Sequence, residues 1–367
     1  MRRRSRRAVL AAVGAATLAA CFPDYAVGPG DGGGVGFDGP VQEAGGDSTV
    51  QDAAGDTTSR DAGGDVSADA EIDSAADARP ESGGDSSTQL PDSGLTDDTI
   101  TMDGGTFTFE IYDTTDAGTG DHTKQATLSY GIVIDRTEET VGRFQAWVAA
   151  GQLHPASMTQ LDPKYPAMLW DSSWDTDVAA TDYSNGTVCN TPGGKGPTYG
   201  LGDPSLPMNC INWAQALAFC WWDNGRRLPT DTEWRVVATS GAVETPYPWG
   251  SQAPDCTYAI FDDGSGLCGW PVDAGSTSAG KTQAGVYDIV GSLSEWLWDF
   301  LPAVYRYPAS AGTDYPGPTG SGNNSRIWIG GDYSQDDTSL KVDQAGPLDS
   351  SPSEPFDNTG FRCARSQ

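Results

Sequence analysis

Histidine is nearly absent from this sequence: the 367-residue chain contains only His122 and His154. A metal centre that needs three histidine ligands cannot be built from it. A Ser-His-Asp triad needs one well-placed histidine, and neither of the two lies in a recognisable motif. The chain also lacks a glycine-rich phosphate loop between a strand and a helix. Several classes of enzyme are thereby excluded, although hydrolysis by paired carboxylates stays open because spatial proximity is invisible in a sequence.

Basic residues are also scarce. Lysine and arginine number 21 against 51 aspartates and glutamates, which gives a net charge of −30. Such a charge argues against a nucleic-acid partner, because neutralisation of phosphates dominates that kind of affinity. Much of the imbalance lies in residues 22–100, which contain eighteen acidic residues, two arginines and few aromatic residues.

Residues 21–100 are therefore expected to form a disordered, acidic tether rich in Gly, Asp, Ser and Ala. Such a segment buries too little apolar surface to offset its chain entropy, and its like charges extend it. A cation-binding tract is the weaker alternative, because the acidic residues lack the fixed spacing of a calcium loop. The folded domain is expected over residues 101–367, which hold all twelve tryptophans.

Long apolar runs are missing too. Ala8–Ala20 is apolar but shorter than the roughly 20 residues that span a bilayer. It follows a cluster of arginines and ends at Leu18-Ala19-Ala20-Cys21. We interpret residues 1–20 as a lipoprotein signal peptide, in which Ser5–Leu10 resembles a twin-arginine export signal.

Cys21 is the expected site of lipidation, because it directly follows the small residues of a lipobox. The alternative is an ordinary secretory signal with a chance cysteine. Acyl chains anchor a protein stably when two or more are present. We therefore expect an exported, membrane-anchored lipoprotein. The residue after the lipidated cysteine is Phe22 and not an aspartate. By resemblance to other lipoproteins, this favours the outer membrane, on its periplasmic or cell-surface face.

Two strands and a helix are predicted in the first part of the folded domain. Thr106–Ile111 and Ala126–Ile134 alternate or run apolar, as strands do. Thr140 is a predicted N-cap, and the helix that follows ends at Gly151. Its expected buried face consists of Phe144, Trp147 and Val148.

Two further helices are predicted in the middle of the chain. Asn212 caps the first, which ends at Gly225, and Thr230 with Glu233 forms a capping box for the second, which ends at Gly241. The expected buried stripe of the first helix is Trp213, Leu217, Cys220 and Trp221. The expected buried residues of the second are Trp234, Val237 and Ala238.

Several sequence blocks occur in one order along the domain. They are Ile134–Glu138, Arg227–Trp234, Tyr247–Gly250, Gly285–Trp296, and Gly330-Gly331 with the final Gly360–Cys363. This order resembles the formylglycine-generating (sulfatase-modifying factor) family, and the blocks cover nearly all of residues 101–367. The resemblance implies the family's variant of the C-type lectin fold, which is one α+β domain with little regular secondary structure.

Six cysteines in an exported domain are expected to form three disulfides, and fifteen pairings are open in principle. The resemblance implies that Cys220 of the central helix pairs with Cys363 of the final motif. The other two pairs are expected only from closeness in sequence, and they are Cys189 with Cys210 and Cys256 with Cys268.

The active site that the resemblance implies is incomplete in this sequence. The family oxidises a substrate cysteine to formylglycine with O₂ and copper held by two thiolates, and soft thiolates suit Cu(I). When the family's motif after the Gly-Gly pair is matched to this sequence without gaps, Gln335 and Leu340 stand at the positions of the two cysteines. No cysteine lies between Cys268 and Cys363. We therefore expect no catalytic residue for cysteine oxidation and no copper.

Calcium is the cofactor that the resemblance does imply. The carboxylates of Asp288 and Glu295 and the carbonyls of Gly291 and Leu293 form an oxygen set that suits Ca²⁺. The alternative is that both acids are merely polar residues on a turn.

A second calcium site of the family would begin near Tyr258. Ile260 stands there in the place of the usual asparagine, which puts this site in doubt. Its remaining expected ligands are Asp262, Asp263 and Glu138.

Three functions remain. The first is a non-catalytic, extracytoplasmic module that binds a peptide or a glycan; the second is a formylglycine-generating oxidoreductase that acts on a sulfatase cysteine through an unconventional site; the third is a structural envelope protein. The missing thiolates favour the first over the second. Polar residues in a groove would separate the first from the third, and the candidates are Asp332, Tyr333, Gln335, Asp336 and Arg362. We expect a monomer that contacts the membrane through Cys21.

Overall fold

The computed structural model of the chain describes residues 94–95, 98–111, 123–179, 183, 189, 194–241, 245–301, 310–317, 325–343 and 351–367. All of them belong to one structural unit, Ser82–Gln367. The expected signal peptide, Cys21, His122 and nearly all of the expected tether lie outside the described residues.

The strands of the described part form three small sheets. In the first, the order is β1 (Thr99–Met102), β4 (Ile132–Asp135) and β9 (Ala364–Ser366), all antiparallel. In the second, the order is β2 (Gly105–Glu110), β3 (Thr123–Leu128) and β6 (Ser310–Thr313), with β6 parallel to β3. In the third, the order is β7 (Arg326–Ile329), β5 (Ser294–Phe300) and β8 (Thr359–Gly360), with β8 parallel to β5.

The helices of the described part are short. The α-helices are α1 (Val141–Ala149), α2 (Asp175–Val178), α3 (Trp213–Trp222) and α4 (Asp231–Ala238). The 3₁₀ turns are η1 (Ser172–Trp174), η2 (Tyr199–Leu201) and η3 (Asp337–Leu340). Within the described residues, no helix combines the length and the apolar character that a membrane span requires.

The helix caps are as the sequence predicts. Thr140 accepts a hydrogen bond from Arg143 N, and capping boxes begin α3 at Asn212 and α4 at Thr230. These caps are local, because each satisfies backbone N–H groups of its own first turn.

The buried stripe predicted for α3 is too narrow. Trp221 is only half-buried, whereas the other nine residues of the helix are buried. Helix α3 is thus buried on all sides, which a single apolar stripe does not describe. Its place inside the domain follows from tertiary packing that the periodicity cannot show.

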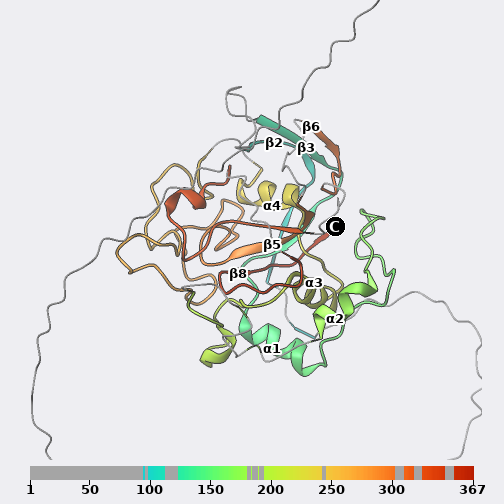
Figure 1. Ribbon diagram of the computed structural model, residues 1–367. Coiled ribbons are helices and arrows are strands. Elements are labelled where there is room, and N and C mark those ends of the chain that lie inside the picture. The colour runs from blue at the N-terminus through green and yellow to red at the C-terminus, as the bar shows by residue number, and fades with distance from the viewer. Residues whose placement is uncertain are drawn as a thin grey trace, which may run out of the picture. The chain divides into compact units, whose positions relative to one another are not determined.

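Helix α4 lies between two of the sheets. It contacts β2 on one side and β5 on the other, as Figure 1 shows. All eight of its residues are buried, including Glu233. The carboxylate of Glu233 forms an ion pair with Arg227 at 2.7 Å, and the charge is thereby satisfied inside the protein.

The prediction of one strand over Ala126–Ile134 is wrong. The chain bends after β3, and β4 belongs to another sheet. At the bend, the backbone N and the hydroxyl of Ser129 donate to the carboxylate of Asp314, at 2.7 and 2.6 Å. The bend depends on a residue 185 positions away, so the local sequence does not reveal it.

Candidate functional site

The segment after Gly330-Gly331 is held rigidly in place. Gly331 has φ of 70°, and a Cβ there would lie 2.8 Å from the backbone oxygen of Ser339, so only glycine fits. Asp332 is fully buried, and its carboxylate accepts hydrogen bonds from Ser334 N and Asn358 Nδ2 at 2.9 and 3.0 Å. Burial raises the pKa of Asp332. The side chain therefore anchors the segment and does not face solvent.

The next residues differ in burial. Tyr333 is 3 % exposed and packs against Ile260 and Leu293. Gln335 is half-buried, and its backbone oxygen accepts a hydrogen bond from Asp262 N at 2.8 Å. Leu340 is fully buried in the main core.

An acidic hollow of about 540 Å³ lies beside this segment. It is lined by Pro254, Phe261, Asp262, Asp263, Gly264, Asp336 and Asp337. The two Asp-Asp pairs come from loops that the hydrogen bond between Asp262 and Gln335 joins. We call this feature the acidic hollow.

Two carboxylates of the acidic hollow have lowered pKa values. Hydrogen bonds from Ser265 lower the pKa of Asp263, and hydrogen bonds from Thr338 lower the pKa of Asp336. Both carboxylates are exposed to solvent. These two aspartates therefore keep their negative charge to lower pH than an ordinary aspartate does.

A second group of acids is buried in the domain, around Arg362. The guanidinium donates to both carboxylate oxygens of Glu295, with Nη2 at 2.5 Å from Oε1 and Nε at 2.9 Å from Oε2. The indole Nε1 of Trp234 also donates to Glu295, at 3.0 Å. All three side chains are almost completely buried. Both oxygens of Glu295 are therefore already occupied by donors.

Glu138 belongs to this same buried group. Its Oε1 accepts a hydrogen bond from Leu293 N at 3.0 Å, whereas its Oε2 is buried and accepts none from any described residue. Burial, together with the carboxylates of Asp288 and Glu295, raises the pKa of Glu138 well above its usual range. A buried carboxylate oxygen without a donor is costly, and a cation would remove that cost.

Comparison with known proteins identifies the family. The profile of the sulfatase-modifying factor enzyme 1-like domain matches residues 86–367. This chain belongs to that family.

A formylglycine-generating enzyme of Thermomonospora curvata is 29 % identical over 185 residues, 46 % of this chain and 59 % of the relative. An inactive Cα-formylglycine-generating enzyme 2 of Mus musculus is 30 % identical over 181 residues, 47 % of this chain and 53 % of the relative. The chain thus spans about half the length of the curated relatives it matches.

The fold also matches a solved structure of this kind. PvdO from Pseudomonas aeruginosa has a TM-score of 0.51 with 18 % identity, over 73 % of this chain and 94 % of that one. The fold is the expected one, an α+β domain of the sulfatase-modifying factor type with little regular secondary structure.

The copper chemistry of the sulfatase-modifying factor family does not fit these residues. The positions at which the resemblance places the two cysteines are occupied by the amide of Gln335 and the buried alkyl group of Leu340. The six cysteines from Cys189 onward are all in disulfides. The segment after Gly330-Gly331 therefore has no thiolate pair that could hold Cu(I) for the oxidation of a substrate cysteine.

The expected calcium ligands are brought near one another, but their roles differ from expectation. The carboxylate of Asp288 is turned toward Gly275 N and the hydroxyl of Thr277, and that of Glu295 toward Arg362. The side chain with a free oxygen is Glu138, which was expected at the second site. Since both oxygens of Glu295 accept hydrogen bonds, Glu138 Oε2 is the carboxylate oxygen among these described acids that is left for Ca²⁺.

The other residues of the second calcium site do not converge. Ile260 is buried, and its backbone oxygen accepts from Ser292 N at 2.8 Å. Asp262 and Asp263 are exposed and accept hydrogen bonds from their own turn. They form a wall of the acidic hollow, away from the buried Glu138.

The expected groove residues fall into two groups, those at the acidic hollow and those that are buried. Asp336 lines the acidic hollow, and Gln335 lies beside it. Arg362, Asp332 and Tyr333 do not line an open groove, because they are at most 3 % exposed. Sequence reasoning missed Asp337, Pro254 and Phe261 as lining residues; the two Asp-Asp dipeptides were the signal that could have found this surface.

The three disulfides pair as expected. Cys189 is bonded to Cys210, Cys220 to Cys363, and Cys256 to Cys268. Two clusters of acids and cysteine also come together, but their cysteines are in these disulfides. They offer no thiolate to a metal. The clusters are Cys256, Asp263 and Cys268, and Asp135, Glu139 and Cys363.

His154 has a structural setting. Its ring stacks on Trp170 with the centroids 5.5 Å apart, and Nδ1 lies 3.5 Å from the carboxylate of Asp175.

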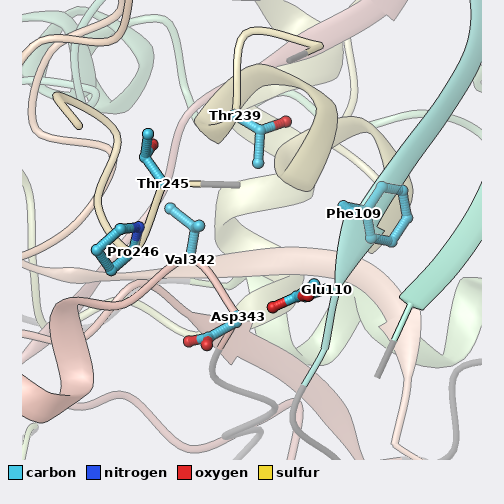
Figure 2. A pocket seen from close by; sticks show the side chains of 7 residues that line it. All are labelled: Phe109, Glu110, Thr239, Thr245, Pro246, Val342 and Asp343. Atoms are coloured by element: carbon cyan, nitrogen blue, oxygen red, sulfur yellow. The ribbon is translucent and has the colours of Figure 1, made fainter. Parts of the chain in front are cut away.

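A smaller hollow of about 140 Å³ lies at the end of α4, shown in Figure 2. Its lining residues are Phe109, Glu110, Thr239, Thr245, Pro246, Val342 and Asp343. The hydroxyls of Thr239 and Thr245 already donate to backbone oxygens of Arg235 and Tyr247. This hollow offers two carboxylates and nothing else that would recognise a ligand, so we assign it no function.

Proposed function

We propose that this chain is an exported, membrane-anchored binding module that does not oxidise cysteine. Its acidic hollow receives a segment of peptide that carries basic side chains. The observation that carries this proposal is the hollow itself, which places four carboxylates next to the segment where the family has its cysteines.

A basic peptide suits this surface better than a glycan does. Four aspartates with no arginine or lysine among the lining residues favour a cationic ligand. The lowered pKa values of Asp263 and Asp336 keep the attraction in place over the physiological range. The volume of about 540 Å³ lies within the usual range of ligand pockets, roughly 300–1,000 Å³.

Loss of catalysis has a parallel among the relatives, one of which is named an inactive formylglycine-generating enzyme. The alternative, cysteine oxidation through an unconventional site, would need a redox centre in a domain whose six described cysteines are all in disulfides. A purely structural envelope protein would have no reason to keep a charged hollow beside a rigid segment. The binding module is therefore the best-supported of the three.

Binding is tested with the full chain purified in detergent and two fluorescent peptides, (Lys-Ala)₃ and (Glu-Ala)₃. We expect the lysine peptide alone to bind, with an affinity that falls as salt is added. Asp263→Asn with Asp336→Asn should weaken binding. Asp273→Asn, an exposed aspartate outside the hollow, is the matched control. Equal binding of both peptides, or equal binding by the double variant, would reject the hollow as the site.

Catalysis is tested separately by mass spectrometry. The chain is incubated with copper, a thiol reductant, O₂ and a Cys-x-Pro-x-Arg peptide, alongside an active formylglycine-generating enzyme. We expect no aldehyde from this chain. Conversion of the peptide's cysteine would overturn the non-catalytic assignment and leave the binding experiment standing.

Calcium belongs to the proposal as a structural ion. Glu138 Oε2 and the backbone carbonyls of Gly291 and Leu293 would hold it. The ion would supply the positive charge that the buried acids around Arg362 lack. Its support is the orphaned oxygen of Glu138.

A further inference from the structure

Arg326 is buried among aromatic rings at the start of β7. It is 1 % exposed, and its guanidinium carbon lies 3.6 Å from the ring centroid of Phe300 and 3.7 Å from that of Trp213. Trp298 and Trp174 lie farther out, at 5.1 and 5.5 Å. A guanidinium stacks well on such faces, because the rings are electron-rich and the cation is weakly hydrated.

One donor of this arginine is unused. Nη1 donates to the backbone oxygen of Trp298, but Nε finds no acceptor among the described residues. Burial lowers the pKa of Arg326 to about 9, with Asp299 opposing the change. A buried N–H without an acceptor carries a desolvation cost that a ligand oxygen would remove.

Arg326 also lines a pocket of about 210 Å³, which we call the Arg326 pocket. The other lining residues are Asp171, Ser173, Trp174, Asp177, Phe300 and Pro352. Asp177 has a pKa raised by burial, and Asp171 has a pKa lowered by hydrogen bonds from Ser173. The pocket thus joins an arginine, two carboxylates, a hydroxyl and aromatic walls.

This mixture selects against charged ligands of either sign. Arg326 would attract an anion, but Asp171 and Asp177 would repel it. The two aspartates would attract a cation, but Arg326 would repel it. A neutral ligand rich in hydroxyl groups satisfies both, because each hydroxyl donates to carboxylates and accepts from the guanidinium. The rings of Trp174 and Phe300 add apolar surface for the C–H groups of such a ligand.

We propose that the Arg326 pocket binds one neutral sugar unit, either free or at the end of a glycan. The volume lies below that of pockets for drug-sized ligands, roughly 300 Å³ and more, so it admits a single ring and not a peptide segment. The residues share none with the acidic hollow. In Figure 1, α2 and the orange-red turn η3 lie on opposite sides of the view, so the two sites are separate. The sugar site is therefore independent of the peptide site, and either can be absent without the other.

The test is saturation-transfer NMR with the full chain in detergent. The probes are the methyl glycosides of glucose, galactose, mannose and N-acetylglucosamine, each measured alone, with methyl glucuronoside and glucosamine as charged counterparts. We expect transfer to at least one neutral glycoside and weaker transfer to both charged sugars. Binding to none of the four, or binding confined to the acidic or the basic sugar, would overturn the proposal.

Variants then locate the binding. Asp177→Ala should weaken the sugar affinity by roughly tenfold, because it removes a charged hydrogen-bond partner. Ser173→Ala should weaken it less, whereas Ser172→Ala, the neighbour in η1 that does not line the pocket, should leave it unchanged. The Asp263→Asn, Asp336→Asn double variant should also bind the sugar normally. Equal loss in the Ser172 and Ser173 variants, or no loss with Asp177→Ala, would show that the sugar binds elsewhere.

Discussion

At the scale of single residues, the domain treats its carboxylates in two ways. Some buried ones, such as Glu295, are matched by arginine, while exposed ones such as Asp336 are held by hydroxyls and amides of their own turn. The first kind fixes the fold, and the second kind stays free to meet a ligand. Arg362 is the residue with which to test this difference, because it is the basic partner of Glu295 inside the core.

Arg362→Ala should lower the free energy of unfolding by about 3–5 kcal/mol, because it leaves the buried charge of Glu295 unanswered. Urea unfolding followed by tryptophan fluorescence measures the change. Arg362→Ala combined with Glu295→Gln should recover part of the loss. A single variant as stable as the original chain would show that Glu295 is neutral in the folded protein.

The acidic hollow predicts a particular pH profile. Only the ionised carboxylates attract the lysine peptide, so a lowered pKa moves the loss of binding to lower pH. The part of the (Lys-Ala)₃ binding that depends on Asp263 and Asp336 should persist from neutral pH to below the usual aspartate value of 3.8. Thr338→Val removes the hydroxyl that bonds to Asp336 and should move the decline to higher pH. Fluorescence anisotropy gives the profile, and a decline well above pH 3.8 in the original chain would contradict the assignment.

Residue types were predictable where the family motif fixes them, and roles were not. The assignment of Gln335 and Leu340 to the cysteine positions stays a prediction from the resemblance. That Arg362 is buried and Asp336 exposed follows from tertiary packing, and no local pattern encodes that. The hydrogen bond between Glu138 and Leu293 was likewise not predictable, since the two residues lie 155 positions apart.

At the scale of elements, helices were easier to predict than strands. The caps at Thr140, Asn212 and Thr230 are contacts within one turn, so the sequence contains all the information. Sheet pairing joins distant segments; β5, for example, pairs with β7 and β8. The bend between β3 and β4 was missed because Asp314 holds it from far along the chain.

The disulfide between Cys220 and Cys363 ties helix α3 to the segment before β9, across 143 residues. By the loop-entropy argument its removal should cost about 4–5 kcal/mol of stability. The double variant Cys220→Ala, Cys363→Ala tests this by thermal unfolding. Cys256→Ala with Cys268→Ala is the matched control, because it opens a separation of only 12 residues and should cost less. A larger loss in the control would mean that the short loop supports the fold more than the long one.

Calcium should stabilise the contact between Glu138 and the residues just before β5. A ligand in hundredfold excess over its Kd adds about 2.7 kcal/mol to the free energy of unfolding. We expect added calcium to raise the melting temperature and a chelator to lower it, with magnesium having less effect. Glu138→Gln should remove most of the gain, whereas Glu110→Gln on β2 should keep it. A melting temperature that does not respond to calcium would reject the ion.

At the scale of the whole molecule, the order of the sequence blocks predicted the fold although each block alone is short. Blocks such as Arg227–Trp234 and Gly360–Cys363 come together because Arg227 pairs with Ala364 across an isolated bridge. Their order along the chain therefore reflects one set of contacts. The acidic residues before position 94 lie outside the part of the chain in which those contacts are described. Their proposed role as a tether requires that the chain is anchored at Cys21.

Anchoring can be tested on the complete chain in a Gram-negative host. Wild-type protein should sediment with membranes, resist a salt wash and enter detergent, because acyl chains contribute about 0.8 kcal/mol per buried CH₂. Cys21→Ser should appear in the soluble extracytoplasmic fraction, with an unchanged melting temperature for the folded domain. Density-gradient separation then distinguishes outer from inner membrane, and the expected location is the outer one. If Cys21→Ser still sedimented with membranes after the salt wash, the attachment would have to come from another part of the chain, and the lipoprotein proposal would be withdrawn while both binding sites remained testable.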